Sequence, residues 1–255
     1  MLFSIITVCF NSAKTIRQTF DSVLKQECTD YEYIVVDGAS ADGTVDIIKE
    51  YEPKFAGRMR WISEPDNGIY DAMNKGIKLS RGNYLNFLNA DDYYEPDTLE
   101  ILRQAITAHP GFDVYYGITR CFDQAGEICI RRESHTRLPW QHIDHQSMWY
   151  RRSVFKSFGL YDTGYRVAAD FHHQVGLFQN SYSFCPIDKL VVNYCFGGYS
   201  ARNLRVLREE TRRIYHHYGY WSNSEYLKDL IKEKLQNLLS GLKTLLRNIK
   251  SLFQH

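Results

Sequence analysis

Segments of strand and helix character alternate along the first part of the chain, and this alternation limits the folds that it can adopt. Strand-length runs with apolar side chains span residues 3–10, 33–36, 60–63 and 84–88. The apolar residues that recur at helical spacing after each run centre on Phe20, Ile48, Met73 and Leu102. This order predicts an α/β fold, in which helices cover both faces of a mostly parallel, Rossmann-like sheet.

The middle of the chain has a weaker pattern. We expect a hairpin around residues 123–126, a short strand over 147–150, helical structure within 151–179 and a last strand over 189–196. The sequence shows no internal repeat and no low-complexity tract that would divide this region. It therefore predicts one globular domain over residues 1–222.

The C-terminal segment, residues 223–255, differs in character. Its apolar residues step by four and three positions in turn, which predicts an amphipathic helix with a narrow seam formed by Ile231, Leu235, Leu238, Leu242, Leu245, Ile249 and Leu252. From Lys234 onward the sequence contains basic residues and no acidic ones. Two placements stay open: on an anionic membrane surface, or packed against the preceding domain or a second copy in a homo-oligomer.

Composition argues against several classes of protein. A formal net charge of +1 on 255 residues argues against a nucleic-acid partner. The six cysteines include no C-x-x-C pair, which argues against a zinc ribbon or a thioredoxin-like site. The first residues have strand character and lack signal-peptide features, and no apolar run is long enough to cross a bilayer. We expect a cytoplasmic protein, which would be peripheral on the inner face of the membrane if its C-terminal helix binds lipid.

Polar side chains follow three of the predicted strands at the point where each strand ends. Asn11 comes directly after Phe10, Asp37 ends the second strand, and Asn89-Ala90-Asp91-Asp92 follows the fourth. The carboxyl ends of parallel strands lie at one edge of a sheet, and ligands of open α/β folds bind there. The sequence therefore predicts a binding site at this edge.

Each of these residues also has a structural interpretation. The adjacent carboxylates of Asp91 and Asp92 suit Mg²⁺ or Mn²⁺, but they could instead cap the helix that begins near Pro96. Asp37 could accept hydrogen bonds from a base or ribose, or begin an Asp-Gly turn. Asp170 could act as a general base or as a helix N-cap. The sequence lacks Walker A and G-x-G-x-x-G patterns, which argues against a kinase, an NTPase or a dinucleotide oxidoreductase.

Four ordered motifs together resemble those of family 2 glycosyltransferases. They are T-V-C-F-N-S-A-K-T-I-R-Q-T-F-D-S-V-L-K-Q from Thr7, Y-E-Y-I-V-V-D-G-A-S-A-D-G-T from Tyr31, E-P-D-N-G-I-Y-D-A-M-N-K-G-I from Glu64 and G-N-Y-L-N-F-L-N-A-D-D from Gly82. A looser resemblance continues through H-Q-S-M-W-Y-R-R-S-V-F and A-A-D-F-H-H to about residue 200. The resemblance implies a GT-A fold, a nucleotide-sugar donor, a divalent cation and inversion at the anomeric carbon.

The resemblance also implies roles for individual residues. It places along the nucleotide-binding edge and donor pocket Thr7, Phe10, Asn11, Asp37, Asp66, Gly68, Asp71, Asn74 and Asn89. Asp91 matches the last acid of the family's D-x-D motif and is the expected principal ligand of Mn²⁺ or Mg²⁺, with Asp92 beside it. Asp170 matches the general base, and His145 and Gln146 fall where the family approaches the acceptor or the donor sugar.

One residue departs from the family pattern, because Asn89 stands where D-x-D has its first acid. Its amide oxygen can still accept a hydrogen bond from a ribose hydroxyl. We therefore expect an active enzyme that transfers a hexosyl or related group from a UDP-sugar, ahead of GDP- or dTDP-sugars, to a saccharide or lipid-linked acceptor, as in surface-polysaccharide synthesis. The processive pattern Q-x-x-R-W is missing from the sequence, which favours transfer of one sugar.

Two other functional classes stay open. Asn89 is the argument for a catalytically silent nucleotide-sugar-binding protein, whereas the acids at 91, 92 and 170 argue against it. A nucleotidyltransferase is also α/β and metal-dependent. Residues 11–14 disfavour it, because they do not form a glycine-rich basic phosphate loop after the first strand.

Overall fold

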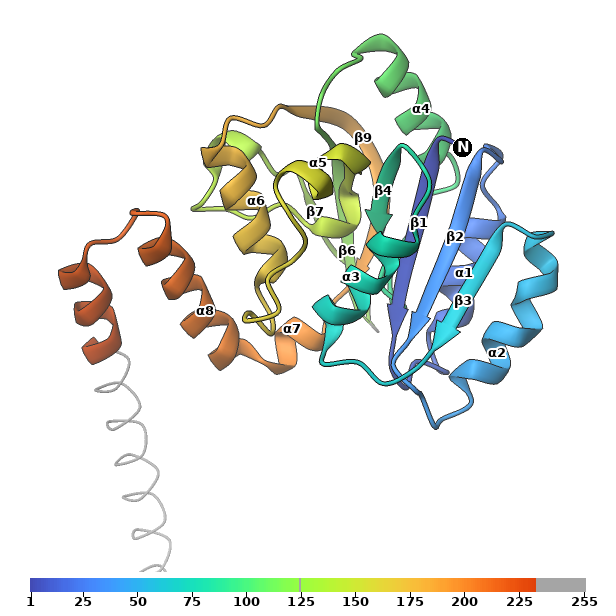
Figure 1. The fold of residues 1–255 in the computed structure, drawn as a ribbon, viewed down its shortest axis with the longest axis horizontal. Coiled ribbons are helices and arrows are strands. Elements are labelled where there is room, and N and C mark those ends of the chain that lie inside the picture. Colours follow the sequence, from blue (N-terminus) through green and yellow to red (C-terminus); the bar gives the residue numbers. More distant parts are fainter. Residues whose placement is uncertain (124, 233–255) are drawn as a thin grey trace, which may run out of the picture. The chain divides into compact units, whose positions relative to one another are not determined.

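The strands predicted in the first part of the chain lie side by side in one sheet of the computed structural model (Figure 1). β1 (Phe3–Cys9) pairs in parallel with β2 (Tyr31–Asp37) and β4 (Tyr84–Phe87), and β3 (Met59–Ser63) pairs in parallel with β2. β1 and β2 are buried along their whole length. Strands that are covered on both faces are expected to be apolar throughout, and this explains the continuous runs seen in the sequence.

Helices cover the two faces of this parallel half. They are α1 (Ile16–Leu24), α2 (Thr44–Tyr51), α3 (Ile69–Leu79) and α4 (Thr98–Ala108), with a short 3-10 turn, η1 (Glu52–Phe55), after α2. α3 crosses the near face of the sheet in Figure 1, and α1 lies behind it. Gly76 lets α3 approach closely, because a Cβ there would overlap the Ile6 side chain of β1. The predicted α/β architecture is confirmed.

The remaining strands make the sheet mixed. β6 (Val114–Asp123) pairs in antiparallel fashion with β8 (Met148–Arg151) and β7 (Gly126–Arg131), and in parallel with β9 (Phe184–Cys195). β8 joins this half to β4, and β5 (Tyr93–Tyr94) pairs with β9. Along the main path the strand order is β3-β2-β1-β4-β8-β6-β9-β5. The carboxyl ends of β1, β2, β4 and β9 therefore lie at the same edge of the sheet.

Several local expectations need correction. The hairpin pairs Asp123 with Gly126 as predicted, but β6 is a long strand in a region whose sequence pattern looked irregular. The helical region after residue 151 is split into α5 (Arg152–Ser157) and α6 (Ala169–Gln179). Asn11, which follows β1 closely, has a positive φ of 52°, and α1 begins only later, with Thr15 as its N-cap.

The structure describes residues 1–123 and 125–232, and the chain divides into the compact units Met1–Arg208 and Glu209–His255. The first unit holds the sheet. α7 (Tyr199–Arg202) and α8 (Leu204–His217) follow β9, and residues 223–232 are helical. The rest of the predicted amphipathic helix, residues 233–255, lies outside the described residues. Among the helices that the structure describes, none combines the length and the apolar character needed to cross a bilayer.

His173 of α6 makes the stability of the first unit depend on pH. Its ring is 1% exposed, stacks on Phe155 and lies 3.1 Å through Nε2 from the carbonyl oxygen of Gly159. Burial lowers its pKa to about 4. The unfolded chain then binds more protons than the folded one between pH 6.5 and 4, so stability falls as the pH falls through that window.

We expect this residue to lower the free energy of unfolding by about 1.4 kcal/mol for each pH unit between pH 6.5 and about 4. Urea unfolding of the wild type and of His173→Gln, each at pH 7 and pH 5, measures the effect. The variant should show the smaller loss of stability between the two pH values. Equal losses in the two proteins would mean that His173 does not titrate as described.

Candidate active site

The loop after β4 carries adjacent acids at the edge where the strands end. Asp91 and Asp92 follow Asn89 in this loop, and the backbone N–H of Cys195 at the end of β9 donates to Asp92 Oδ1 over 2.9 Å. The acids do not cap a helix, because α4 begins only at Thr98 with Asp97 as its N-cap. Their position at the strand ends is therefore not explained by helix capping.

The two acids have different surroundings. Asp92 is 1% exposed, and its Oδ2 accepts hydrogen bonds from Gln146 Nε2 at 2.7 Å and from Asn89 Nδ2 at 3.2 Å. Asp91 is only partly buried, and within the described residues no other residue donates a hydrogen bond to its carboxylate. The protein therefore occupies both Asp92 oxygens and leaves the Asp91 carboxylate available to a ligand.

The electrostatics of the loop favour a cation. Burial raises the pKa of Asp91, against smaller lowerings by a hydrogen bond from its own backbone N–H and then by the charges of Arg202 and His145. Burial and the neighbouring Asp91 charge raise the pKa of Asp92 well above its usual range. Two adjacent carboxylates in a low-dielectric position are costly to ionise together, and a divalent cation removes that cost. The donor set of carboxylate oxygens suits Mg²⁺ or Mn²⁺.

Asp170 is the second residue of α6, whose N-cap is Ala168, so it does not cap the helix. Its Oδ1 accepts hydrogen bonds from Tyr70 Oη at 2.7 Å and from the backbone N–H of Phe171 at 2.9 Å. Its Oδ2 lies 2.9 Å from His145 Nδ1. Burial raises the pKa of Asp170, but the hydrogen bonds and charges, that of His145 first, outweigh burial and the pKa is lowered. The carboxylate is therefore ionised at neutral pH.

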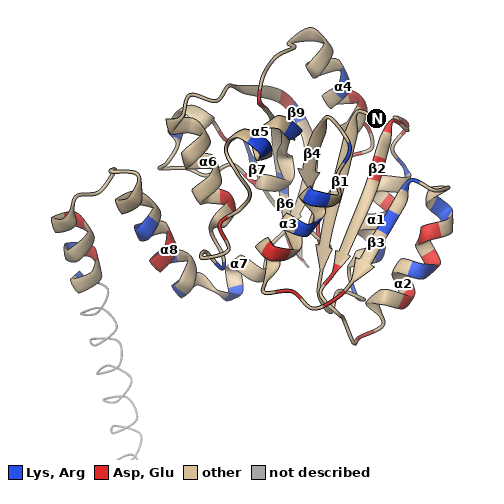
Figure 2. Cartoon of the chain, viewed as in Figure 1, with Lys and Arg blue, Asp and Glu red and all other residues tan. Residues whose placement is uncertain are grey.

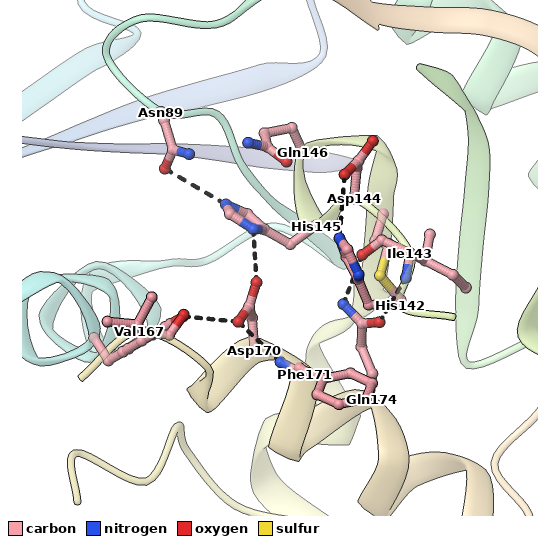
Figure 3. A network of polar contacts seen from close by, with 12 residues as sticks. Asn89, His142, Ile143, Asp144, His145, Gln146, Val167, Asp170, Phe171 and Gln174 are labelled. Carbon is pink, nitrogen blue, oxygen red and sulfur yellow. Dashed lines mark hydrogen bonds and ion pairs between the residues drawn. The ribbon is translucent and has the colours of Figure 1, made fainter. Parts of the chain in front are cut away.

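A chain of polar contacts joins Asp170 to the acidic loop, which is the segment from Asn89 to Asp92 after β4. Figure 3 shows the His145 ring between the two, with Nδ1 toward Asp170 and Nε2 3.5 Å from Asn89 Oδ1. Asn89 contacts Asp92 in turn, and Gln146 reaches Asp92 from the same 3-10 turn that carries His145, η3 (His145–Ser147). The structure thus brings five residues singled out in the sequence into one connected network.

Five other predicted residues line the edge next to β1 and β2. Phe10 is 64% exposed, and Asn11 Oδ1 accepts a hydrogen bond from the backbone N–H of Ala41 in the loop after β2. Gly68 precedes α3, and the flanking carboxylates of Asp66 and Asp71 accept backbone hydrogen bonds across this turn. Figure 2 shows acidic residues along the segment from β3 to the start of α3. This edge offers an exposed aromatic face and carboxylates to a ligand.

Three further predicted residues lie inside the fold. Thr7 donates to the Leu88 carbonyl, and both polar ends of the Asn74 amide bond the Tyr161 backbone. Asp37 is fully buried, and its oxygens accept hydrogen bonds from the hydroxyls of Ser40 and Ser63. These side chains hold neighbouring segments together, and the structure does not bring them to the surface of the site.

A second group of possible cation ligands lies beside the network. One ligand atom each from Glu133, His142 and Asp144 lies within 4.8 Å of the others. Arg131 already pairs with Asp144 over 2.8 Å, and burial, with Asp144 next, raises the pKa of Glu133 to about 7. The charges of these carboxyl groups are therefore neutralised by other groups of the protein to a greater degree than the charge of Asp91.

The structure adds residues that the sequence did not single out for chemistry. Tyr70 orients Asp170, and a pocket of about 220 Å³ beside it is lined by Gly68, Asp71, Tyr165 and Tyr199 among others. Arg202 is the first positive charge that acts on Asp91. The only sequence signal for Arg202 was its place just after the Gly197-Gly198 pair.

Sequence comparison relates this chain to proteins with known names. The family described as "Glycosyl transferase family 2" matches residues 4–168. A PGL/p-HBAD biosynthesis glycosyltransferase of Mycobacterium tuberculosis is 38% identical over 184 residues, which are 70% of this chain and 70% of that protein. Chondroitin synthase of Escherichia coli is 32% identical over 127 residues, 50% of this chain and 18% of the synthase.

Solved structures show the same fold. Residues 1–349 of TarS from S. aureus, in complex with UDP-GlcNAc, match with a TM-score of 0.69 and 21% identity, over 86% of this chain and 65% of that TarS segment. The mannosyltransferase PcManGT from Pyrobaculum calidifontis, in complex with GDP-Man and Mn²⁺, matches with a TM-score of 0.67 and 15% identity, over 87% of this chain and 65% of that one. This chain thus spans just under two thirds of each. By sequence and fold together, it belongs to glycosyl transferase family 2 and is a glycosyltransferase with a GT-A fold.

Proposed function

We propose that this glycosyltransferase inverts the configuration of a sugar that it transfers from a nucleotide-diphosphate donor. One observation carries the proposal: an ionised, largely buried Asp170 is linked through His145 and Asn89 to the acidic loop at the strand ends. A base for the acceptor and a binding place for the leaving diphosphate would then lie at one site. Such a pair is what a single displacement needs.

In the proposed reaction, Asp170 accepts the proton of an acceptor hydroxyl while that oxygen attacks the anomeric carbon of the donor sugar. The bond from this carbon to the diphosphate oxygen breaks, and the diphosphate leaves with the bonding electrons. Attack occurs on the face opposite the leaving group, so the configuration inverts. Tyr70 and His145 hold the carboxylate in one orientation throughout.

Asp91 is the residue that we assign to a divalent cation, Mn²⁺ or Mg²⁺. Among the described residues no other residue donates to its carboxylate, whereas Asp92 is held by Gln146, Asn89 and the Cys195 backbone and orients the loop. When bound there, such a cation supplies positive charge next to the donor phosphates. PcManGT, which shares the fold, binds Mn²⁺ together with GDP-Man.

The donor and acceptor are proposed by class. TarS binds UDP-GlcNAc and PcManGT binds GDP-Man, and we keep UDP-sugar as the first choice, followed by GDP- and dTDP-sugars. The named relatives are a PGL/p-HBAD biosynthesis glycosyltransferase and a chondroitin synthase, which fits a lipid-linked or saccharide acceptor in surface-polysaccharide or glycolipid synthesis. The exposed Phe10 ring is the surface on which we place the nucleobase.

The location of the protein and the role of its C-terminal segment remain proposals. We propose a cytoplasmic protein whose residues 223–255 bind either the inner membrane surface or protein, which would be the preceding domain or a second copy of the chain. Flotation with anionic liposomes, compared between the full chain and a truncation before Glu225, separates the two. Equal flotation of both proteins would end the membrane interpretation.

The experiment that tests the proposed function is an analysis of products. The protein is incubated with Mn²⁺, a nucleotide-sugar and a hydroxyl acceptor, and both the nucleotide and the new glycosidic bond are identified by NMR. Release of the nucleoside diphosphate with an inverted anomer supports the proposal. Release of pyrophosphate would indicate a nucleotidyltransferase, and tight donor binding without any turnover would indicate the silent binding protein.

The pH dependence of the reaction depends on His145. Because its hydrogen bond and charge lower the pKa of Asp170, we expect His145→Ala to raise that pKa. The base must be ionised, so activity is lost as the pH falls through its pKa. The acid limb of the pH profile of kcat/KM should therefore move to higher pH in the variant. His109→Ala, on the end of α4, is the control and should keep the wild-type profile.

A further inference from the structure

The segment after β9 runs directly over the acidic loop. Cys195 is tied to Asp92 through its backbone N–H, and Gly197 turns the chain with a φ of +95°. A Cβ built on Gly198 would lie 3.1 Å from Asp91 Oδ2, so the backbone of this glycine rests against the Asp91 carboxylate. The glycine pair thus allows the chain to cross the proposed cation ligand closely.

The same segment reaches the pocket beside the proposed base. Tyr199, the first residue of α7, lines the pocket of about 220 Å³ together with Gly68 and Tyr70. The Tyr70 hydroxyl donates a hydrogen bond to Asp170. Residues 197–202 therefore extend from Asp91 toward the pocket that contains Tyr70, which is the span that a donor diphosphate and its sugar would occupy.

Arg202 is the last residue of α7, and its guanidinium group is only partly engaged in hydrogen bonds. Its Nε donates to the Gly197 carbonyl at 3.0 Å, which fixes the side chain over the turn. It forms no ion pair with any carboxylate in the described parts of the chain, and its two terminal nitrogens have no acceptor there. Its charge acts on Asp91 from a distance, ahead of that of His145. A guanidinium in this state can bind two phosphate oxygens at once.

The negative charge of the leaving diphosphate favours a positively charged side chain such as Arg202 at this site. A departing nucleoside diphosphate carries more negative charge than one divalent cation neutralises. Within the three positions that match D-x-D, this chain has one carboxylate, that of Asp91, where the motif has two, because Asn89 replaces the first acid and uses its amide to contact Asp92 and His145. A weaker anionic site for the metal leaves more of the phosphate charge to be met by protein donors.

We propose that Arg202 binds the diphosphate of the donor, with the Gly197-Gly198 turn holding it over Asp91. This inference rests on the proposed function, since it names the residue that meets the leaving group of that reaction. Arg202 donates to the phosphate oxygens in the bound donor and stabilises their charge as the bond to the sugar breaks. The nucleoside itself makes no contact with Arg202.

The test is calorimetric binding of nucleotides in the presence of Mn²⁺. UDP, GDP and dTDP are titrated into the wild type, and the one that binds is compared with its monophosphate in Arg202→Ala, Arg202→Lys and Arg103→Ala. We expect Arg202→Ala to weaken diphosphate binding about 10- to 100-fold, because charge-assisted hydrogen bonds are lost. Binding of the monophosphate should change by less than about threefold. Arg202→Lys should fall between wild type and Arg202→Ala, and Arg103→Ala on α4 should match the wild type.

Two results would overturn the inference. Diphosphate binding by Arg202→Ala at wild-type affinity would remove Arg202 from the site. An equal loss of monophosphate and diphosphate binding would show that the substitution disturbs the pocket, and Arg202→Lys, which keeps the charge, checks this independently. Failure of the proposed function itself looks different, because the wild type would then bind none of the three diphosphates.

Discussion

Asp170→Asn should lower kcat by about 10²- to 10⁴-fold while donor binding stays within about twofold of the wild type. The substitution keeps the size of the side chain and can still contact His145 and the Phe171 backbone, but it removes the negative charge that accepts the proton. Steady-state kinetics with a nucleotide-sugar, combined with calorimetric binding of the nucleoside diphosphate, separates the two effects.

The same substitution at a distant position provides the control. Asp188 is 91% exposed and pairs with Arg132 at the surface, so Asp188→Asn should keep wild-type kinetics. Loss of donor binding in Asp170→Asn would argue that the residue shapes the donor pocket. Unchanged kcat in that variant would refute its role as the base.

Asp91→Asn should remove most of the dependence of donor binding on Mn²⁺ and lower kcat/KM by about 10²- to 10³-fold. The reason is that, among the described residues, no other residue donates a hydrogen bond to the Asp91 carboxylate, whereas an amide is a poor ligand for a hard cation. Titration of the nucleoside diphosphate with and without Mn²⁺ measures the first effect, and kinetics measure the second.

Asp46→Asn, an exposed change on α2, serves as the matched control and should bind Mn²⁺ and nucleotide normally. If Asp91→Asn kept full metal dependence, the cation would have to lie elsewhere. The neighbouring group of Glu133, His142 and Asp144 would then be the first place to look.

The parallel half of the fold was predictable because its strands are buried on both faces. In such strands most positions are apolar, so residues 3–10 and 33–36 stand out as runs, and helices at regular spacing follow. The other half was harder to predict. Gly117 interrupts β6 in the sequence like a turn residue, yet it is there because a Cβ would lie 2.6 Å from the Val191 side chain of β9.

The candidate site was predictable where chemistry and position coincide. Asp91, Asp92 and Asp170 could be chosen because acids at strand ends and in an apolar segment are costly without a purpose. Sequence could not distinguish the roles of Asp91 and Asp92, since that depends on the Gln146 amide and the Cys195 N–H, which come from distant segments. Arg202 could not be chosen either, because only the close approach of Gly198 places it near Asp91.

The role of Asn89 cannot be predicted from the motif alone. In the sequence it is a departure from D-x-D that raises the idea of a silent protein. In the structure its side-chain nitrogen donates a hydrogen bond to Asp92, and its side-chain oxygen lies 3.5 Å from His145 Nε2. Asn89 therefore connects the acidic loop to the proposed base. A carboxylate at this position would lack the donor and would add a third negative charge to the loop.

The most direct test of the account is a calorimetric titration of UDP, GDP and dTDP into the protein, each with and without Mn²⁺. We expect one of the three to bind tightly, and only when Mn²⁺ is present, which would establish a donor site at the acidic loop and narrow the sugar donors to derivatives of that nucleotide. Absence of binding by all three nucleotides, with the metal present, would contradict the central claim that this edge of the sheet holds a nucleotide-sugar.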